Sequence, residues 1–164
     1  MDAIEITFEI PAFAPTDGEA IARDRFGVAA TATPLPGERD RNFLLCTGAG
    51  ERYVLKISHA GEARALLELQ NEVLDHLAAQ APDLRLSRVV RSLAGEGIVE
   101  RAGPTGTRHF VRLLTWVDGR MMADVSPHDI TLLESLGETL GAVDRSIIYN
   151  DANDHNVVVE ATGP

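Results

Sequence analysis

Residues 149–159 read YNDANDHNVVV and place a run of Asn, Asp and His side chains directly before three valines. Such side chains bind metal ions or transfer protons. The valines that follow them predict a buried strand. Asp151 and Asn156 lie five residues apart, at the two ends of the polar run. Residues 149–156 are therefore a candidate loop for metal-binding or proton-transfer chemistry.

Two metal-binding interpretations fit this run poorly. Asp151, Asn153 and His155 alternate as the first ligands of an EF-hand do. However, Asn156 stands where an EF-hand needs glycine, and Thr162 where it needs glutamate. A zinc site is also disfavoured, since the run has one histidine and no cysteine nearby. A solvated turn that begins a strand remains the simple alternative, because Asn and Asp are common in turns.

A second pair of residues favours phosphoryl transfer. In protein-kinase-like enzymes a loop aspartate accepts the proton of the substrate hydroxyl, and an asparagine five residues later binds a metal ion; Asp151 and Asn156 have this spacing. Such enzymes also use a strand lysine that a helix glutamate holds. Lys56 stands in the apolar strand pattern YVLKI, and Glu72 follows in a helical pattern, with Glu68 as a competing candidate one turn earlier.

The elements that would position these residues follow from hydrophobic periodicity. Apolar residues at three- and four-residue spacing predict an amphipathic helix over 60–80, with a stripe of Leu66, Leu69, Val73 and Leu77. Further helices are expected at 16–27 and 129–145. The predicted strands are 29–34, 42–47, 52–58, 97–102 and 108–117. Strands grouped around one helix indicate an α+β layer with an antiparallel sheet.

In order along the chain, the segments PLPGERDRNFLL, RYVLKIS, LELQNEVLDHLA, HFVRLLTWVDGR and NDANDHNVVV resemble the aminoglycoside phosphotransferase superfamily. The resemblance is greatest to hydroxylysine kinase and to the kinase-like domain fused to class III aminotransferases. It implies a protein-kinase-like fold. Residues 1–117 would form an N-lobe with a five-stranded sheet and one packed helix, and residues 118–164 a reduced helical C-lobe.

The resemblance also implies roles for individual residues and for cofactors. The turn 37–41 would lie over the nucleotide's phosphates, and the segment 113–117 would be the hinge whose backbone reads the base. ATP or GTP and Mg²⁺ would be the cofactors, and a cationic amino alcohol such as hydroxylysine the substrate. The implied set is Lys56, Glu72, Arg39, Thr115 and Trp116 for the nucleotide, Asp151 as catalytic base, and Asn156 for the metal ion.

Three departures from the family pattern lead us to expect a truncated or internally deleted chain. Tyr149 stands where the family has histidine, and no DFG-like aspartate follows the loop. Only 35 residues separate Trp116 from Asp151, where the family has several helices. We therefore expect little or no turnover unless a partner chain or fused domain supplies the missing C-lobe. The alternative is a non-catalytic remnant that binds a nucleotide or packs on a partner.

Composition limits the partners and the location. A net charge of −10 disfavours nucleic acid and suits a cationic substrate. No stretch reaches the ~20 apolar residues of a membrane span. The acidic start, MDAIEITFEIPAF, does not resemble a secretory signal, so a cytoplasmic protein is expected. Cys46, the single cysteine, is expected to be buried, and His59 and His109 to be surface residues.

Overall fold

The computed structural model describes residues 9–126, 130–142 and 158–159. Its contacts divide the chain into two compact units, which are described separately: residues 1–74 with 87–116, and residues 75–86 with 117–164. The first unit holds α1 (Pro15–Phe26), β1 (Ala30–Leu35), β2 (Arg41–Thr47), β3 (Arg52–Ile57), β4 (Val89–Val90), β5 (Val99–Ala102) and β6 (Arg108–Thr115). Helix α2 (Arg64–Gln80) contributes its first turns to this unit.

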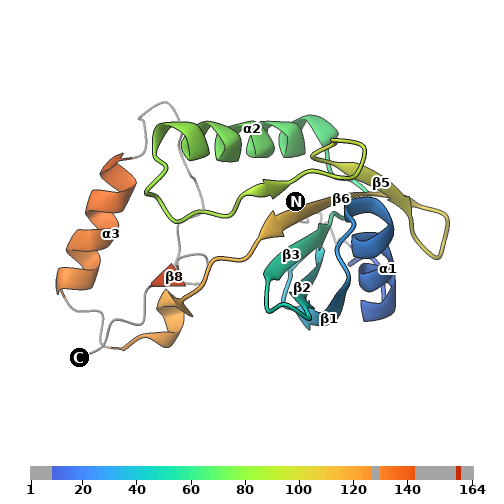
Figure 1. Ribbon diagram of the computed structural model, residues 1–164, viewed down its shortest axis with the longest axis horizontal. Coiled ribbons are helices and arrows are strands. Elements are labelled where there is room, and N and C mark those ends of the chain that lie inside the picture. Colours follow the sequence, from blue (N-terminus) through green and yellow to red (C-terminus); the bar gives the residue numbers. More distant parts are fainter. Residues whose placement is uncertain (1–8, 127–129, 143–157, 160–164) are drawn as a thin grey trace, which may run out of the picture. The chain divides into compact units, whose positions relative to one another are not determined.

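The first unit is built on a six-stranded antiparallel sheet in the order β1-β2-β3-β6-β4, with β5 also paired to β6 (Figure 1). All five predicted strands are present. The short strand β4 was not predicted as part of the sheet. Together with the helices, this sheet confirms the α+β fold class.

One face of the sheet is apolar and is covered by α1. Phe43, Leu45, Leu55, Ile57, Val111 and Leu113 are completely buried on this face. Ile21, Ala22 and Phe26 of α1 complete the same core cluster. The sequence predicted that helix 60–80 packs on the sheet, and α2 does so on the opposite face. The apolar core under this face is completed by α1, which was not expected to pack there.

Helix α1 begins and ends with clear local causes. Pro15 occupies its first turn, and the carboxylate of Asp17 accepts a hydrogen bond of 2.8 Å from the N–H of Ala14. Gly27 ends the helix at φ 70°, a conformation that favours glycine. Gly18 allows close packing, since a Cβ there would lie 3.0 Å from the ring of Phe43.

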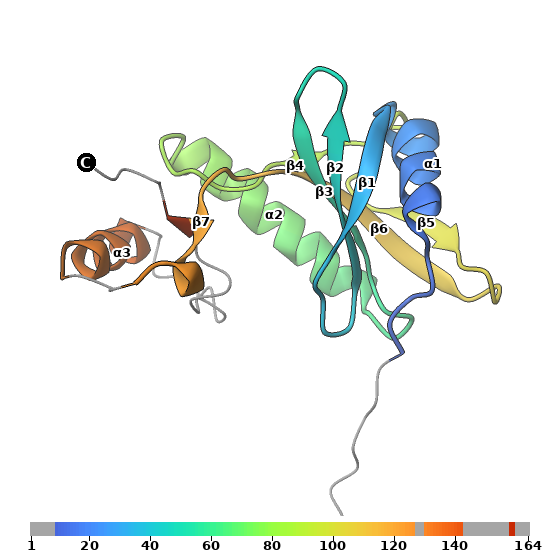
Figure 2. The same cartoon turned by 90° about the horizontal axis from the view of Figure 1, so that it is seen from below.

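Helix α2 lies on the opposite face and is attached by polar contacts. Figures 1 and 2 show α2 running along β6, on the other side of the sheet from α1. The guanidinium of Arg64 lies 5.8 Å from the ring centroid of Phe110 in β6. The predicted stripe is wrong in its first turn, because Leu66 is 46% and Leu69 55% exposed. The residues that α2 buries in these turns are Leu67 and Asn71.

Three single-residue expectations are corrected by burial. Cys46 is exposed, because it lies near the end of β2, on the sheet face that α1 does not cover. His59 and His109 are 6% and 8% exposed and are therefore interior residues. The Nδ1 atom of His109 lies 2.9 Å from the carbonyl oxygen of Ser58, and its ring meets Phe13 edge to face. His109 is thus a hydrogen-bonded core residue.

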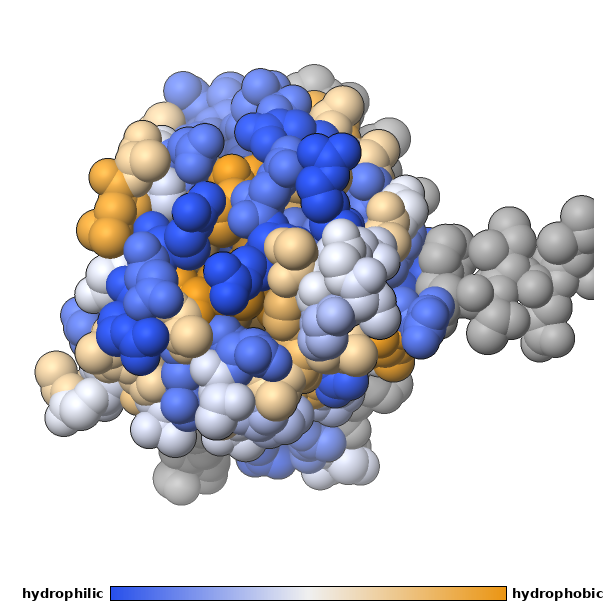
Figure 3. Space-filling view, turned by 90° about the vertical axis from the view of Figure 1, so that its right-hand side faces the viewer, coloured by the Kyte–Doolittle hydropathy of each residue, from blue (hydrophilic) through white to orange (hydrophobic). Residues whose placement is uncertain are grey.

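In the second unit, β7 (Arg120–Met121) pairs antiparallel with β8 (Val158–Val159). A 3-10 helix, η1 (Met122–Asp124), follows β7, and α3 spans Ile130–Ala142 within the predicted helix 129–145. Across the described residues, no helix has the length and apolar character that a membrane crossing requires. Figure 3 shows the side that carries α1 and β5, where hydrophilic side chains surround smaller hydrophobic areas.

Candidate functional site

The sheet face that α1 leaves uncovered carries one polar row and one apolar row. Residues paired across antiparallel strands lie on the same face. The pairing Asn42–Lys56–Arg112 therefore makes a polar row across β2, β3 and β6. A second, apolar row lies two residues along the strands from the polar row. Its partly exposed side chains are Leu44, Val54, Leu114 and Val89. A flat apolar strip beside a cationic row suits a ligand with an aromatic base and an anionic group.

Lys56 is the central cation of this face. It is the only lysine in the chain. Among residues 9–126, 130–142 and 158–159, no side chain makes a hydrogen bond or ion pair with its ammonium. Burial lowers the pKa of Lys56, the positive charge of Arg112 lowers it further, and Asp40 partly opposes them. A partly buried ammonium with no fixed partner is suited to receive an external anion.

Arg112 fills the position beside Lys56 and connects the sheet to α2. Its side chain is 6% exposed. One terminal nitrogen donates to Oδ1 of Asn71 at 3.1 Å and the other to Oε1 of Gln70 at 2.6 Å. The amide of Asn71 in turn donates to the carbonyl oxygen of Gly97. This chain of hydrogen bonds holds α2 against β6.

The expected ion pair between Lys56 and Glu72 is not formed within the described part of the chain. Glu72 is exposed on α2 and lies next to the buried Asn71. The competing candidate, Glu68, accepts a hydrogen bond of 2.8 Å from Arg64 instead. The residue of α2 that contacts the polar row at this position is thus Asn71 and not Glu72.

The turn between β1 and β2 is tightly built. A Cβ at Gly37 would collide with the carbonyl oxygen of Asp40 and the side-chain amide of Asn42. That amide also donates to the carbonyl oxygen of Pro36 at 3.2 Å. Because Asn42 belongs to the polar row, this contact ties the turn to the site. Arg39 is exposed at the tip of the turn.

Thr115 and Trp116, which were expected to lie in the hinge, use their backbone N–H groups in hydrogen bonds within the chain. The N–H of Thr115 donates to the carbonyl oxygen of Arg88 at 2.9 Å, and the N–H of Trp116 to that of Arg52 at 3.1 Å. The Trp116 ring lies 5.9 Å from the guanidinium of Arg52. The N–H of Arg88 also donates to the hydroxyl of Thr115 at 2.8 Å, so both amides and this hydroxyl already take part in hydrogen bonds within the chain.

The predicted catalytic and metal-binding residues, Asp151 and Asn156, lie outside the described residues, as does the rest of the loop 149–156. Of the polar run and its valines, the structure describes Val158 and Val159, which form β8. The valine strand predicted after the loop is therefore present in part.

One group of potential metal ligands occurs among the described residues. Asp40, His59 and Glu62 each place one ligand atom within 4.8 Å of the others. Nδ1 of His59 accepts a hydrogen bond from the N–H of Gly61, so Nε2 carries the ring proton and faces Glu62 at 3.4 Å. A nitrogen that carries a proton is not a metal ligand, and magnesium prefers oxygen ligands. We therefore interpret this cluster as a hydrogen-bonded support for the loop after β3.

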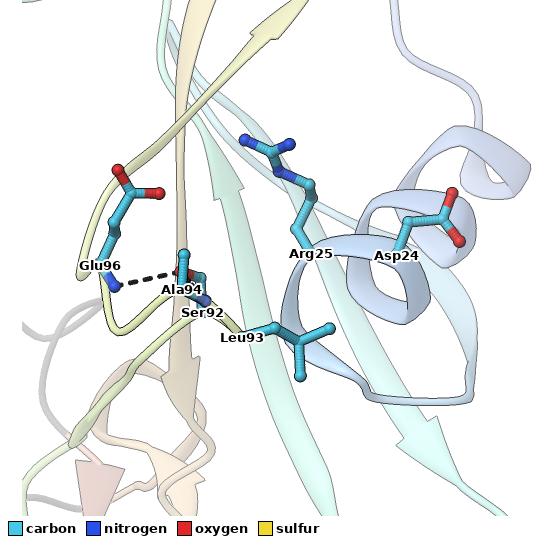
Figure 4. A pocket seen from close by; sticks show the side chains of 6 residues that line it. All are labelled: Asp24, Arg25, Ser92, Leu93, Ala94 and Glu96. Carbon is cyan, nitrogen blue, oxygen red and sulfur yellow. Dashed lines mark hydrogen bonds between the residues drawn. The ribbon is translucent and has the colours of Figure 1, made fainter.

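A small hollow of about 130 Å³ lies between the end of α1 and the turn after β4 (Figure 4). Its polar groups serve the local structure. The hydroxyl of Ser92 accepts hydrogen bonds from the N–H groups of Ala94 and Glu96. None of the predicted site residues that the structure describes lines the hollow.

Sequence reasoning missed Arg112, Asn42 and the apolar row. Each belongs to a strand that was predicted, but their convergence depends on the register between strands. One feature of the sequence did mark the site: the chain has a single lysine, although it has fifteen basic residues.

Comparisons with known proteins bear on the family and the fold. The profile described as "Phosphotransferase enzyme family" matches residues 31–146, more than half of the chain. Among solved structures, the fold resembles an amicoumacin kinase in complex with AMP-PNP, Ca²⁺ and Ami, with a TM-score of 0.57 and 17% identity. That match covers 73% of this chain and 36% of the kinase chain. A search of curated proteins gave no match.

Proposed function

The chain belongs to the phosphotransferase enzyme family, and from this we propose that it binds ATP or GTP on the sheet face opposite α1, beside α2. The terminal phosphate would pass to a hydroxyl group of a small, amine-bearing metabolite such as hydroxylysine. The observation that carries the proposal is the ammonium of Lys56. Lys56 belongs to the polar row, next to the apolar row, and its ammonium makes no hydrogen bond or ion pair with a described residue.

The two rows suggest how a nucleotide would lie. The base would rest on Leu44, Val54 and Leu114, and the phosphates would extend toward Lys56. Arg39, at the tip of the β1–β2 turn, would approach the phosphates from above the sheet. Thr115 would border the base at the end of β6. AMP-PNP and Ca²⁺ in the amicoumacin kinase support a nucleotide and a divalent ion in this fold.

The transfer step is proposed from the family resemblance. Asp151 would accept the proton of the attacking hydroxyl, and Asn156 would hold Mg²⁺ on the phosphates. Residues 1–117 and 118–164 would act as the two lobes around this step. The chain spans 36% of the amicoumacin kinase chain, so a contribution from a partner chain or fused domain is part of the proposal. The net charge of −10 supports a cationic substrate.

Calorimetric titration with ATP and with GTP, with and without magnesium, tests the binding step. We expect saturable binding that Lys56→Met weakens by at least about tenfold, since a charged hydrogen bond to phosphate is lost. Arg108→Gln is the matched control, because Arg108 is an exposed cation on β6 paired with Glu100. Absence of nucleotide binding by the folded wild type would exclude the proposal.

Turnover on a panel of amino alcohols then separates the enzyme from the alternative. Phosphorylation of one acceptor in the presence of magnesium is the expected result. Nucleotide binding without phosphorylation of any acceptor would instead favour a non-catalytic nucleotide-binding protein.

A further inference from the structure

Two positive charges lie side by side on the polar row. Lys56 and Arg112 are direct partners in the β3–β6 pairing, which places their Cβ atoms roughly 5 Å apart. Both side chains are at least partly buried, where charges repel more strongly than in water. Among the described residues, neither forms an ion pair within 4.0 Å. Asp40 and Glu62 are near enough to raise the pKa of Arg112, but burial, the largest influence, lowers it.

The groups that hold Arg112 are neutral. Both hydrogen-bond partners of its guanidinium, Gln70 and Asn71, are amides. An amide fixes the orientation of an arginine without cancelling its charge, whereas a carboxylate would do both. The orientation of Asn71 is itself fixed by its hydrogen bond to Gly97. The arrangement therefore holds a positive charge rigidly beside Lys56 through neutral groups, and the carboxylates of Asp40 and Glu62 act on it only from a distance.

We propose that Arg112, held by Gln70 and Asn71, is the second positive charge of a polyphosphate-binding site whose first is Lys56. This inference rests on the proposed function, because it assigns the anion to the nucleotide. Arg112 is nearly buried, so it acts at short range through its charge while Lys56 contacts the phosphate. Affinity then increases with the number of phosphate charges on the ligand.

Gln70→Glu gives the sharpest test. Gln70 is exposed, and its side-chain oxygen accepts a hydrogen bond of 2.6 Å from Arg112. A glutamate of the same shape keeps this contact and neutralises the charge. We expect the affinity for ATP to fall by about tenfold, the affinity for adenosine to change by less than about twofold, and the melting temperature to be maintained. Gln80→Glu, which adds the same charge to an exposed position of α2, should leave both affinities unchanged.

Arg112→Gln removes the charge itself. We expect this substitution to lower the affinity for ATP by about 10- to 100-fold, to lower the affinity for ADP by less, and to change the affinity for adenosine little. Arg112→Lys, which keeps the charge, should recover most of the ATP affinity. Arg108→Gln is the control for an arginine lost from the same strand. If Arg112→Gln does not fold, Gln70→Glu decides the question alone.

The outcomes distinguish this inference from the proposed function. If the wild type binds no nucleotide, both fail. If it binds ATP and Lys56→Met abolishes binding, but Gln70→Glu and Arg112→Gln keep wild-type ATP affinity, only the inference fails. Equal losses for ATP and adenosine would also overturn it, since they would show that Arg112 serves the fold alone.

Discussion

Partial burial of the Lys56 ammonium lowers the stability of the folded protein. Burial lowers its pKa, which means that its charged form is less stable in the folded chain than in the unfolded chain. We therefore predict that Lys56→Met raises stability by about 0.5–2 kcal/mol, or a few degrees in melting temperature, while nucleotide binding is lost. Thermal unfolding followed by circular dichroism measures this effect. A lower melting temperature would show that Lys56 has a stabilising partner.

The same residue predicts a dependence on pH. Between the lowered pKa of folded Lys56 and its value of 10.5 in the unfolded chain, the unfolded state binds more protons. Stability therefore rises with pH in that window. The advantage of Lys56→Met over the wild type should shrink as the pH approaches 10.5. Urea unfolding of both proteins at neutral and at alkaline pH measures the difference; a constant difference would contradict the prediction.

Glu72 should matter little for the nucleotide. It is exposed and forms no ion pair with Lys56 among the described residues. We predict that Glu72→Gln changes ATP affinity by less than about twofold, a range typical of removing an unpaired surface charge. Calorimetric titration measures the ATP affinity of the variant and of the wild type. A loss comparable to that of Lys56→Met would mean that the two side chains pair when ligand binds.

At the residue scale, the place of Lys56 on a strand of the sheet could be predicted from the sequence, because a charged residue within an apolar strand pattern is conspicuous. Arg112 could not, because its strand, RHFVRLLT, carries other arginine and histidine residues that give no sign of which one is buried. Asn71 was missed for a related reason: apolar periodicity assigns the buried face of a helix to leucines. The partner of Asn71, Arg112, lies far away in the sequence, so the reason for burying this asparagine can be recognised only in the folded structure.

At the scale of elements, the turn between β1 and β2 offers a controlled experiment. We predict that Gly37→Ala destabilises the protein by about 1–3 kcal/mol, because the added methyl group meets the carbonyl of Asp40 and the amide of Asn42. Gly48→Ala, in the next turn, should be nearly neutral, since nothing lies within 4 Å of its Cβ position. Urea unfolding compares the two variants. Equal effects would show that the turn is adaptable.

The strands could be predicted well because alternation, Gly-containing turns and β-branched residues agree along the chain. The roles of the helices could not. Both 16–27 and 60–80 have helical patterns, and the longer one was expected to cover the sheet. In the structure, α1 contributes Ile21 and Phe26 to the core, whereas α2 is joined to β6 through Arg112. Periodicity finds a helix but does not say which sheet face it meets.

At the scale of the whole molecule, the proposed transfer step would need residues from both ends of the chain. If Asp151 is the base, Asp151→Asn should reduce turnover by at least about 100-fold and leave ATP affinity within about twofold. Coupled assays of phosphate transfer and calorimetry measure the two quantities separately. Unchanged turnover would remove Asp151 from the mechanism, and a large loss of ATP affinity would assign it to binding.

The exposed thiol of Cys46 has a practical consequence for such experiments. It lies on the same sheet face as Leu44, two residues along β2, and it is the only sulfhydryl group in the chain. A maleimide fluorophore would therefore attach at one position, beside the proposed seat of the base. Its emission would report occupancy in real time, so that association and dissociation rates could be followed by stopped flow without a modified nucleotide.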